Sequence, residues 1–222
     1  GANFNNLSKP FKRYQVGTVW RNEKPGPGRF REFTQVDADI VGTKNILADA
    51  EVCILLADTL VKCGLSKSDF IIRVNNRKCL SGIFEWLKIT DEKQIINTIR
   101  AIDKMDRLGN EGVKSLLGKG RKDESGDFTK GVGLNSKQIK EIIDYINTDI
   151  EFFREAPDVS YDGISKIYDN GIKELSKFFN NTRVSEFRDQ IVYSSSLVRG
   201  IEYYTGIIFE AELLFKVKNK KG

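Results

Sequence analysis

The chain has 222 residues, of which 40% are hydrophobic and 30% charged, and its net charge is +5. This composition predicts a folded protein and excludes a disordered one. It contains no histidine, which excludes Ser-His-Asp and Cys-His nucleophiles, a histidine general base and histidine-ligated metals. Cys53, Cys63 and Cys79 form no Cys-x-x-Cys pair, which argues against a disulfide framework and a structural zinc site. No apolar run approaches the ~20 residues of a membrane span, so we expect a cytoplasmic protein with reduced thiols and no membrane partner.

Strand patterns occupy both ends of the chain, and helical patterns occupy its middle. The first two expected strands, 12–21 and 30–41, flank a loop rich in glycine and proline, which predicts an antiparallel hairpin. Apolar residues at helical spacing predict a helix over 44–63, and Gly64 follows it as a stop signal. The remaining expected elements are a strand at 70–75, helices at 78–88, 91–108, 136–147 and 163–179, a loop at 118–133, and strands at 189–198 and 201–215.

The order of these elements predicts an α+β fold in which the middle of the chain is inserted between two ends that form one body. Charge supports this division, because residues 1–90 have a net charge of +5, residues 91–190 of −2 and residues 191–222 of +2. We therefore expect an anion-binding core made of 1–90 and 191–222, with 91–190 as a helical insertion domain.

The second strand of the hairpin has a polar and aromatic face. Successive side chains of a strand point to opposite sides, so the even positions Val36, Ala38 and Ile40 form an apolar face. The odd positions form a row of Arg31, Phe33, Gln35, Asp37 and Asp39. Arg21 and Arg29, at the ends of the loop, would converge on a phosphate, and an aromatic ring between arginines offers a purine a stacking surface. The hairpin thus resembles a nucleotide site; the alternative is that the row faces water, as one side of an antiparallel sheet often does.

A second concentration of functional residues lies near the end of the chain. Arg199 and Gly200 enter the last expected strand, and a glycine there lets the backbone approach a ligand closely. Tyr203 and Tyr204 offer phenolic hydrogen-bond donors. Alternation places the two rings on opposite faces, so only one of them lines a given pocket unless a bulge intervenes. The alternative for Tyr203 is an aromatic residue packed in the core.

Both stretches resemble motifs of one enzyme family. Residues 13–42 are similar to motif 2 of class II aminoacyl-tRNA synthetases, in the form found in histidyl-tRNA synthetases, and 197–206 resembles their histidine-specific motif. Residues 73–82 also resemble that family, whose variable insertion falls where 91–190 lies. The resemblance implies a class II antiparallel β-sheet with flanking helices. It also implies a homodimeric ligase that activates L-histidine with ATP and Mg²⁺, transfers it to tRNA(His) and needs no protein-ligated metal.

The resemblance assigns the nucleotide-binding roles to the hairpin. Arg21 would hold the α-phosphate of ATP and Phe33 would stack on adenine, while Glu23 would contact the adenine edge and Arg29 the distal phosphates. Activation is an in-line attack of a carboxylate on the α-phosphorus, so fixed guanidinium groups stabilise it and no general base is needed. This chemistry is compatible with a chain that has no histidine.

The resemblance divides the histidine-binding roles between the two motifs. Gln35 and Asp39 would line the histidine pocket together with Tyr203, and Asp39 and Tyr204 would recognise the imidazole. Arg199 would be the catalytic arginine, at the α-phosphate and the substrate carboxylate. A carboxylate paired with a phenol suits an imidazole, because such a site rejects analogues that lack the ring nitrogens.

Several parts of the family pattern have no counterpart in the sequence, namely motif 1, motif 3 and the anticodon-binding domain, and the only methionine is the internal Met105. We therefore expect an internal fragment of a catalytic domain that binds ATP weakly and aminoacylates little or not at all alone. One alternative is a non-catalytic histidyl-tRNA-synthetase-like module that binds tRNA or regulates a partner. Another is a basic hairpin that binds nucleic acid without ATP. The insertion either contacts tRNA or packs on the core, and its segment 118–133 is interpreted as a solvated loop.

Overall fold

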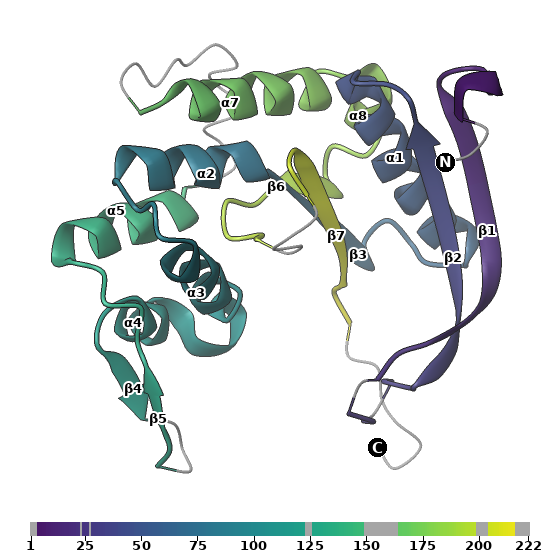
Figure 1. Cartoon of the computed structure of the whole chain (residues 1–222). Coiled ribbons are helices and arrows are strands. Elements are labelled where there is room, and N and C mark those ends of the chain that lie inside the picture. The colour runs from purple at the N-terminus through teal and green to yellow at the C-terminus, as the bar shows by residue number, and fades with distance from the viewer. Residues whose placement is uncertain are drawn as a thin grey trace.

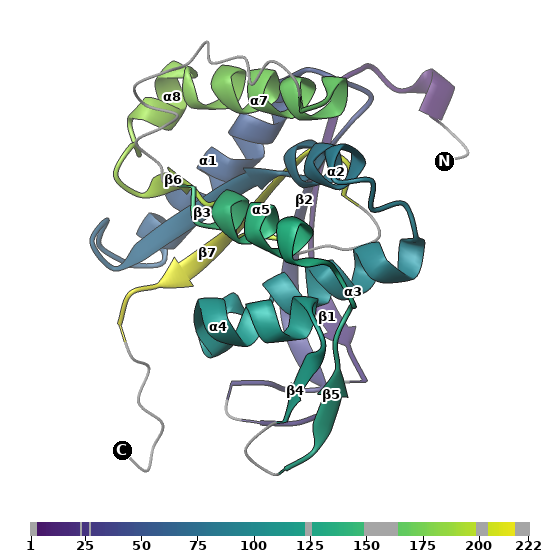
Figure 2. The same cartoon turned by 90° about the vertical axis from the view of Figure 1, so that its left-hand side faces the viewer.

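Helices flank three separate β-sheets in the part of the chain that the computed structural model describes (Figures 1 and 2). The described residues are 4–22, 24–26, 28–122, 126–148, 164–198 and 204–215. The strands are β1 (Phe11–Trp20), β2 (Glu32–Val41), β3 (Phe70–Asn76), β4 (Gly120–Lys122), β5 (Phe128–Lys130), β6 (Ile191–Tyr193) and β7 (Ile207–Leu213). The helices are a 3₁₀ turn η1 (Phe4–Asn6), α1 (Ile46–Lys62), α2 (Arg77–Trp86), α3 (Glu92–Ile102), α4 (Met105–Leu117), α5 (Ser136–Ile146), α7 (Lys166–Phe179) and α8 (Thr182–Ser185). None of these helices is both long and apolar enough to cross a membrane.

The first sheet is the β1–β2 hairpin, and it confirms the antiparallel pair expected at 12–21 and 30–41. Its register runs from Phe11 opposite Val41 to Trp20 opposite Glu32. Ten residues of each strand pair without a bulge, so the odd and even faces stay separate along the whole hairpin.

The second sheet has the order β6–β3–β7, with β3 antiparallel to β7 and parallel to β6. Phe70, Ile72 and Val74 of β3 are at most 1% exposed. They belong to the core beneath α1 and α7. Helix α7 packs on β3, and helix α1 packs on β7. The other face of this sheet is mixed, with Arg73, Glu210 and Glu212 beside Ile71, Val192 and Ile208. The α+β class predicted from the sequence is thus confirmed, with one parallel pair added to the expected antiparallel strands.

Helices α2 and α7 cross at very short range (Figures 1 and 2). A Cβ built on Gly82 of α2 would lie 2.6 Å from the Cβ and the backbone nitrogen of Tyr168 in α7. A Cβ on Gly171 of α7 would lie 2.7 Å from the Sγ of Cys79 in α2. Glycine at both positions therefore permits the two helices to approach this closely. The packing against α7 holds α2 in place directly after β3.

The predicted helix at 91–108 is wrong, because the chain forms two helices there. Helix α3 ends at Ile102, α4 begins at Met105, and Gly109 interrupts the helical backbone of α4 with a φ of 61°. The predicted loop at 118–133 is also wrong in part, because it contains the β4–β5 hairpin, which projects beyond α4 in both views (Figures 1 and 2). Gly120 permits this pairing: its φ is 105°, and a Cβ there would lie 2.2 Å from the carbonyl oxygen of Thr129.

The two C-terminal strands are shorter than predicted. The strand expected at 189–198 is limited to β6, after which the N–H of Leu197 bonds the carbonyl of Ser194 in a turn. The strand expected at 201–215 starts at Ile207, and 199–203 lies outside the described residues. Aromatic and β-branched composition indicates extended backbone, but the number of paired residues depends on the neighbouring strand.

Candidate functional site

The odd-numbered faces of β1 and β2 form one continuous polar surface, which we call the polar row. The register places Arg13 opposite Asp39, Gln15 opposite Asp37, Gly17 opposite Gln35 and Val19 opposite Phe33. Phe33, Gln35 and Asp37 are partly buried, whereas their even-numbered neighbours Glu32, Thr34 and Val36 are exposed. Over residues 32–37, the polar row is thus the more buried face of β2.

Three of the residues assigned to ATP and histidine binding meet in this row. The guanidinium carbon of Arg21 lies 5.1 Å from the centre of the Phe33 ring, in cation–π contact. The same guanidinium donates a hydrogen bond of 2.9 Å to the side-chain oxygen of Gln35. The Gln35 amide in turn donates to Asp37 at 2.6 Å. The structure therefore brings a guanidinium group, an aromatic ring and a polar amide together.

The end of the row that was predicted to bind histidine contains an ion pair that the sequence did not indicate. Arg13 Nε lies 2.8 Å from the carboxylate of Asp39, and another guanidinium nitrogen of Arg13 donates to Gln15 at 3.2 Å. Both partners of the ion pair are about half exposed. Arg13 and Gln15 were not among the predicted site residues. Alternation along 12–21 would have placed them on one face, but only the register shows which residues of β2 they oppose.

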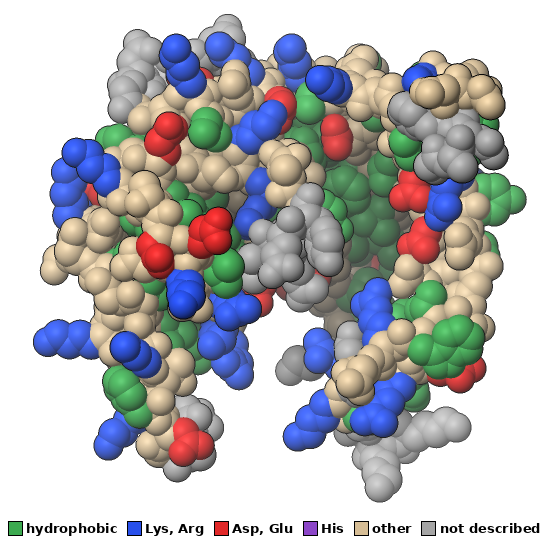
Figure 3. Space-filling view, viewed as in Figure 1, with side chains coloured by type: hydrophobic (Ala, Val, Ile, Leu, Met, Phe, Trp, Pro, Cys, Tyr) green, Lys and Arg blue, Asp and Glu red, His purple; other side chains and the backbone are tan. Residues whose placement is uncertain are grey.

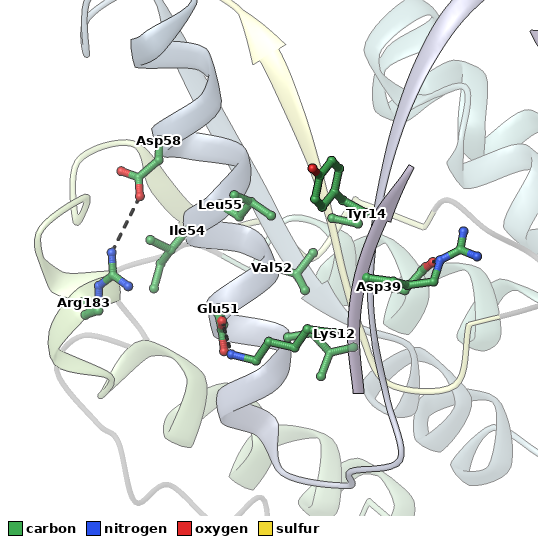
Figure 4. A pocket seen from close by; sticks show the side chains of 12 residues that line it. Lys12, Tyr14, Asp39, Glu51, Val52, Ile54, Leu55, Asp58 and Arg183 are labelled. Carbon is green, nitrogen blue, oxygen red and sulfur yellow. Dashed lines mark hydrogen bonds and ion pairs between the residues drawn. The ribbon is translucent and has the colours of Figure 1, made fainter. Parts of the chain in front are cut away.

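The opposite, apolar face of the hairpin is covered over only part of its length. Val36 is 67% exposed, whereas Ala38 and Ile40 line a hollow of about 300 Å³ between the hairpin and α1 (Figure 4). The side chains around this hollow include Tyr14, Val52, Ile54 and Leu55, with the ion pairs Lys12–Glu51 and Arg183–Asp58 at its rim. Val36 is exposed because α1 covers the hairpin only near its open end. The apolar face therefore meets α1 over part of its length.

A second polar surface lies on the central sheet. Arg73 of β3 forms a 2.8 Å ion pair with Glu212 of β7, and Glu210 lies opposite Arg73 in the register. Together with Asp103, Asp106 and two serines, these residues line a hollow of about 270 Å³. It lies on the sheet face turned away from the core under α1 and α7, just as the polar row is turned away from α1. The sequence assigned no role to these acidic residues, although alternation in 70–76 would have separated Arg73 from the buried face.

Two more of the predicted site residues, Tyr204 and Arg29, lie within the described part of the chain. Tyr204 is 58% exposed and precedes β7, and Arg29 is exposed in the hairpin loop, where it forms a bridge with Gly26. Glu23, Arg199 and Tyr203 lie outside the described residues.

Basic side chains gather over the tip of the β1–β2 hairpin, and others lie along the top of the molecule over α7 and around the β4–β5 hairpin (Figure 3). The tip contributes Arg21, Lys24, Arg29 and Arg31, all exposed. Such a cluster attracts a polyanion. No cluster of three or more cysteine, aspartate or glutamate side chains suited to a metal ion occurs within the part of the chain that is described.

Comparisons with known proteins point to one family. The family model described as histidyl-tRNA synthetase matches residues 2–212. A histidine–tRNA ligase of Rhizobium leguminosarum is 48% identical over 229 residues, which cover 99% of this chain and 44% of the relative. A histidine–tRNA ligase of Bartonella bacilliformis is 44% identical over 229 residues, which cover 99% of this chain and 45% of the relative. The chain thus spans less than half the length of these relatives.

Solved structures show the same likeness. A histidyl-tRNA synthetase of Nostoc sp. PCC 7120 superimposes with a TM-score of 0.72 at 28% identity, covering 96% of this chain and 46% of that one. A protein of Bacillus halodurans, described as an ATP phosphoribosyltransferase regulatory subunit/histidyl-tRNA synthetase, has a TM-score of 0.69 at 17% identity, covering 96% of this chain and 50% of that one. The second likeness shows a shared fold.

Proposed function

We propose, because this chain belongs to the histidyl-tRNA synthetase family, that it supplies the ATP- and histidine-binding surface of a histidine–tRNA ligase. The matches confirm the resemblance of its two motifs to that family. The complete reaction would join histidine to AMP with release of pyrophosphate and then transfer the histidyl group to tRNA(His). Since the chain spans less than half of its relatives' length, we propose this reaction, with a homodimeric cytoplasmic enzyme, for the full-length product of its gene.

The observation that carries the proposal is the polar row, where Arg21 lies over Phe33 and is bonded to Gln35. A fixed guanidinium beside an aromatic ring provides ATP with a charge for the α-phosphate and a stacking surface for adenine. Arg29 and the other basic residues of the hairpin tip would attract the distal phosphates and the Mg²⁺ complex of ATP, with Glu23 at the adenine edge. Arg199 would add positive charge where the transition state becomes more negative.

Histidine would bind farther along the same strand, at Gln35 and Asp39. The carboxylate of Asp39 is oriented by its ion pair with Arg13, so one of its oxygens is available to accept a hydrogen bond from an imidazole N–H. Tyr204, and Tyr203 if its ring shares that side, would offer a phenolic group to the ring. This order along β2, with the nucleotide group Phe33 first and the histidine groups two to six residues later, would place the reacting carboxylate beside the α-phosphate.

The test is histidine-dependent exchange between ATP and pyrophosphate by the full-length product. Phe33→Ala should weaken ATP binding by about 1–3 kcal/mol, the usual contribution of a base stacked on an aromatic ring, which corresponds to about 5–150-fold. The matched control is Val36→Ala, which removes an exposed apolar side chain from the opposite face of the same strand and should leave exchange unchanged. Equal loss in both variants, or no exchange by the wild-type protein, would contradict the proposal.

The alternative is a non-catalytic module that binds tRNA or regulates a partner. The fold it shares with the Bacillus halodurans protein makes this alternative worth testing. A regulatory module would bind its partner equally well after Arg21→Ala and Phe33→Ala and would show no histidine-dependent exchange. A ligase would lose exchange in both variants.

A further inference from the structure

The ion pair of Arg13 with Asp39 joins the two strands of the hairpin at the end of the polar row that was predicted to bind histidine. The register places the two residues directly opposite each other, and Arg13 Nε lies 2.8 Å from the Asp39 carboxylate. Another guanidinium nitrogen of Arg13 donates to the side-chain oxygen of Gln15 at 3.2 Å. The guanidinium is thus held by two partners, and its positive charge stays beside the carboxylate.

A ligand can reach this ion pair. The side chains of Arg13 and Asp39 are 45% and 48% exposed, and a carboxylate has about four lone-pair sites for hydrogen-bond donors. An imidazole N–H that donates to Asp39 would therefore share the carboxylate with the guanidinium of Arg13. At such a separation the charge of the guanidinium acts on the charge of the ring.

The other charged groups around Asp39 are already engaged. Asp37, two residues away on the same face of β2, accepts a hydrogen bond from Gln35 at 2.6 Å. On the side of the hairpin that faces α1, charged side chains form two neutral ion pairs, Lys12–Glu51 and Arg183–Asp58 (Figure 4). Removing Arg13 would therefore leave Asp37 and Asp39 without the cation that stands opposite Asp39.

A single carboxylate and a carboxylate paired with a guanidinium favour different forms of an imidazole. The ring has an ordinary pKa of about 6.5, so neutral and cationic histidine coexist near neutral pH. A carboxylate by itself stabilises the cation, whereas a neighbouring guanidinium destabilises it. The neutral ring still has an N–H to donate to the carboxylate, and it carries no charge for the guanidinium to repel.

We propose that Arg13 is a specificity-determining residue of the histidine pocket: by neutralising Asp39, it makes the pocket bind the neutral imidazole of histidine in preference to the imidazolium. This inference rests on the proposed function, in which Asp39 accepts a hydrogen bond from the substrate ring. Arg13 would act through Asp39 and through its own charge. It would supply the repulsive element that specificity often needs beside an attractive one.

The first test counts the protons released when histidine binds to the full-length product. Isothermal titration calorimetry in buffers of different ionisation enthalpy gives this number. At pH 6 the wild-type protein should release about 0.5–0.8 proton per histidine, the protonated fraction of the free amino acid, and at pH 8 almost none. Arg13→Gln keeps a hydrogen-bond donor for Asp39 without the charge and should release less than about 0.2 proton at pH 6. Arg13→Lys should restore the wild-type number.

Lys12→Ala is the matched control. Lys12 is the neighbouring basic residue, and it forms an ion pair of similar exposure on the opposite face of the same strand. This variant loses the same charge but should release the wild-type number of protons. At pH 8, where the ring is neutral, Arg13→Gln should still bind histidine within about fivefold of the wild-type affinity. Loss of binding there would show a structural role and overturn the inference.

The pH dependence of the KM for histidine in ATP–pyrophosphate exchange gives a second readout. From pH 8 to pH 6 this KM should rise about two- to fourfold in the wild-type protein and in Lys12→Ala, because the neutral fraction of histidine falls. In Arg13→Gln it should stay constant or fall. An active Arg13→Gln variant with the wild-type proton release and pH profile would refute the inference alone. A wild-type protein that binds histidine with the expected proton release but shows no exchange would refute the proposed ligase activity alone.

Discussion

Replacing Gly82 by alanine should destabilise the protein, although alanine is the better helix former. The added Cβ would lie 2.6 Å from the Cβ and the backbone nitrogen of Tyr168 and 2.8 Å from the hydroxyl of Ser165. Ordinary contact begins at 3.4 Å, so α2 and α7 must separate by roughly 0.8 Å. A backbone nitrogen cannot rotate away as a flexible side chain can, so the helices themselves must move.

The magnitude follows from two opposing effects. Overpacking a filled site costs about 1–3 kcal/mol, and a clash with backbone favours the upper part of that range. Alanine in place of glycine inside a helix contributes about 1 kcal/mol in the other direction. We expect a net loss of about 1–2 kcal/mol, which lowers the Tm of a chain of this size by about 2–8 °C. Thermal unfolding followed by far-UV circular dichroism measures it.

Ser81→Ala is the matched control, because Ser81 is exposed on the same helix and its replacement should leave the Tm unchanged or slightly higher. Gly171→Ala should resemble Gly82→Ala, since its Cβ would lie 2.7 Å from the Sγ of Cys79. The double variant should lose less than the sum of the two, because one separation of the helices relieves both clashes. A Tm for Gly82→Ala at or above the wild-type value would refute the close approach.

Three further changes test other parts of the structure. Arg13→Ala should cost less than about 1 kcal/mol of stability, because its ion pair with Asp39 is half exposed, yet it should raise the KM for histidine; an unchanged KM would remove Arg13 from the site. Burial raises the pKa of the Cys53 thiol to about 12. Above pH ~9 the thiol ionises in the unfolded chain but stays protonated in the folded protein, so the free energy of unfolding falls by up to about 1.4 kcal/mol per pH unit as pH rises toward 12. Urea midpoints of Cys53→Ala should therefore fall less steeply over that range, and an identical slope would contradict the burial. Asn135→Ala removes the side-chain half of the capping box of α5, in which the Asn135 amide oxygen accepts from the backbone N–H of Gln138, and should cost about 1 kcal/mol, whereas an unaltered urea midpoint would show that this cap is dispensable.

The β1–β2 hairpin was predictable because its signals are local. Ten-residue alternating strands bounded by a loop dense in glycine and proline determine both the pairing and the face of each side chain. The same alternation identified the row of Phe33, Gln35 and Asp39. The ion pair of Arg13 with Asp39 needed the register as well, and the register depends on how many residues the loop contains.

Other features depend on neighbours that the sequence does not reveal. The break between α3 and α4 falls at Asp103 and Lys104, where neither glycine nor proline interrupts the helical pattern. Strands β4 and β5 are three residues each, too short for a periodic signal. The exposure of Val36 follows from where α1 ends its contact with the hairpin. The side-chain amide of Asn75 donates to the carbonyl oxygens of Ser195 and Leu197, which lie more than a hundred residues away in the chain.

The polar row is stable without a ligand because its members bind one another. Arg21 is bonded to Gln35, Gln35 to Asp37, and Asp39 to Arg13. A phosphate or an imidazole that enters the row exchanges these partners for its own, and an exchanged hydrogen bond changes the free energy by only about 0.5–1.5 kcal/mol. Under the proposed function, binding strength would therefore come chiefly from stacking on Phe33 and from the basic tip of the hairpin. The row itself would contribute position, which is what an in-line attack on a phosphate requires of the guanidinium groups around it.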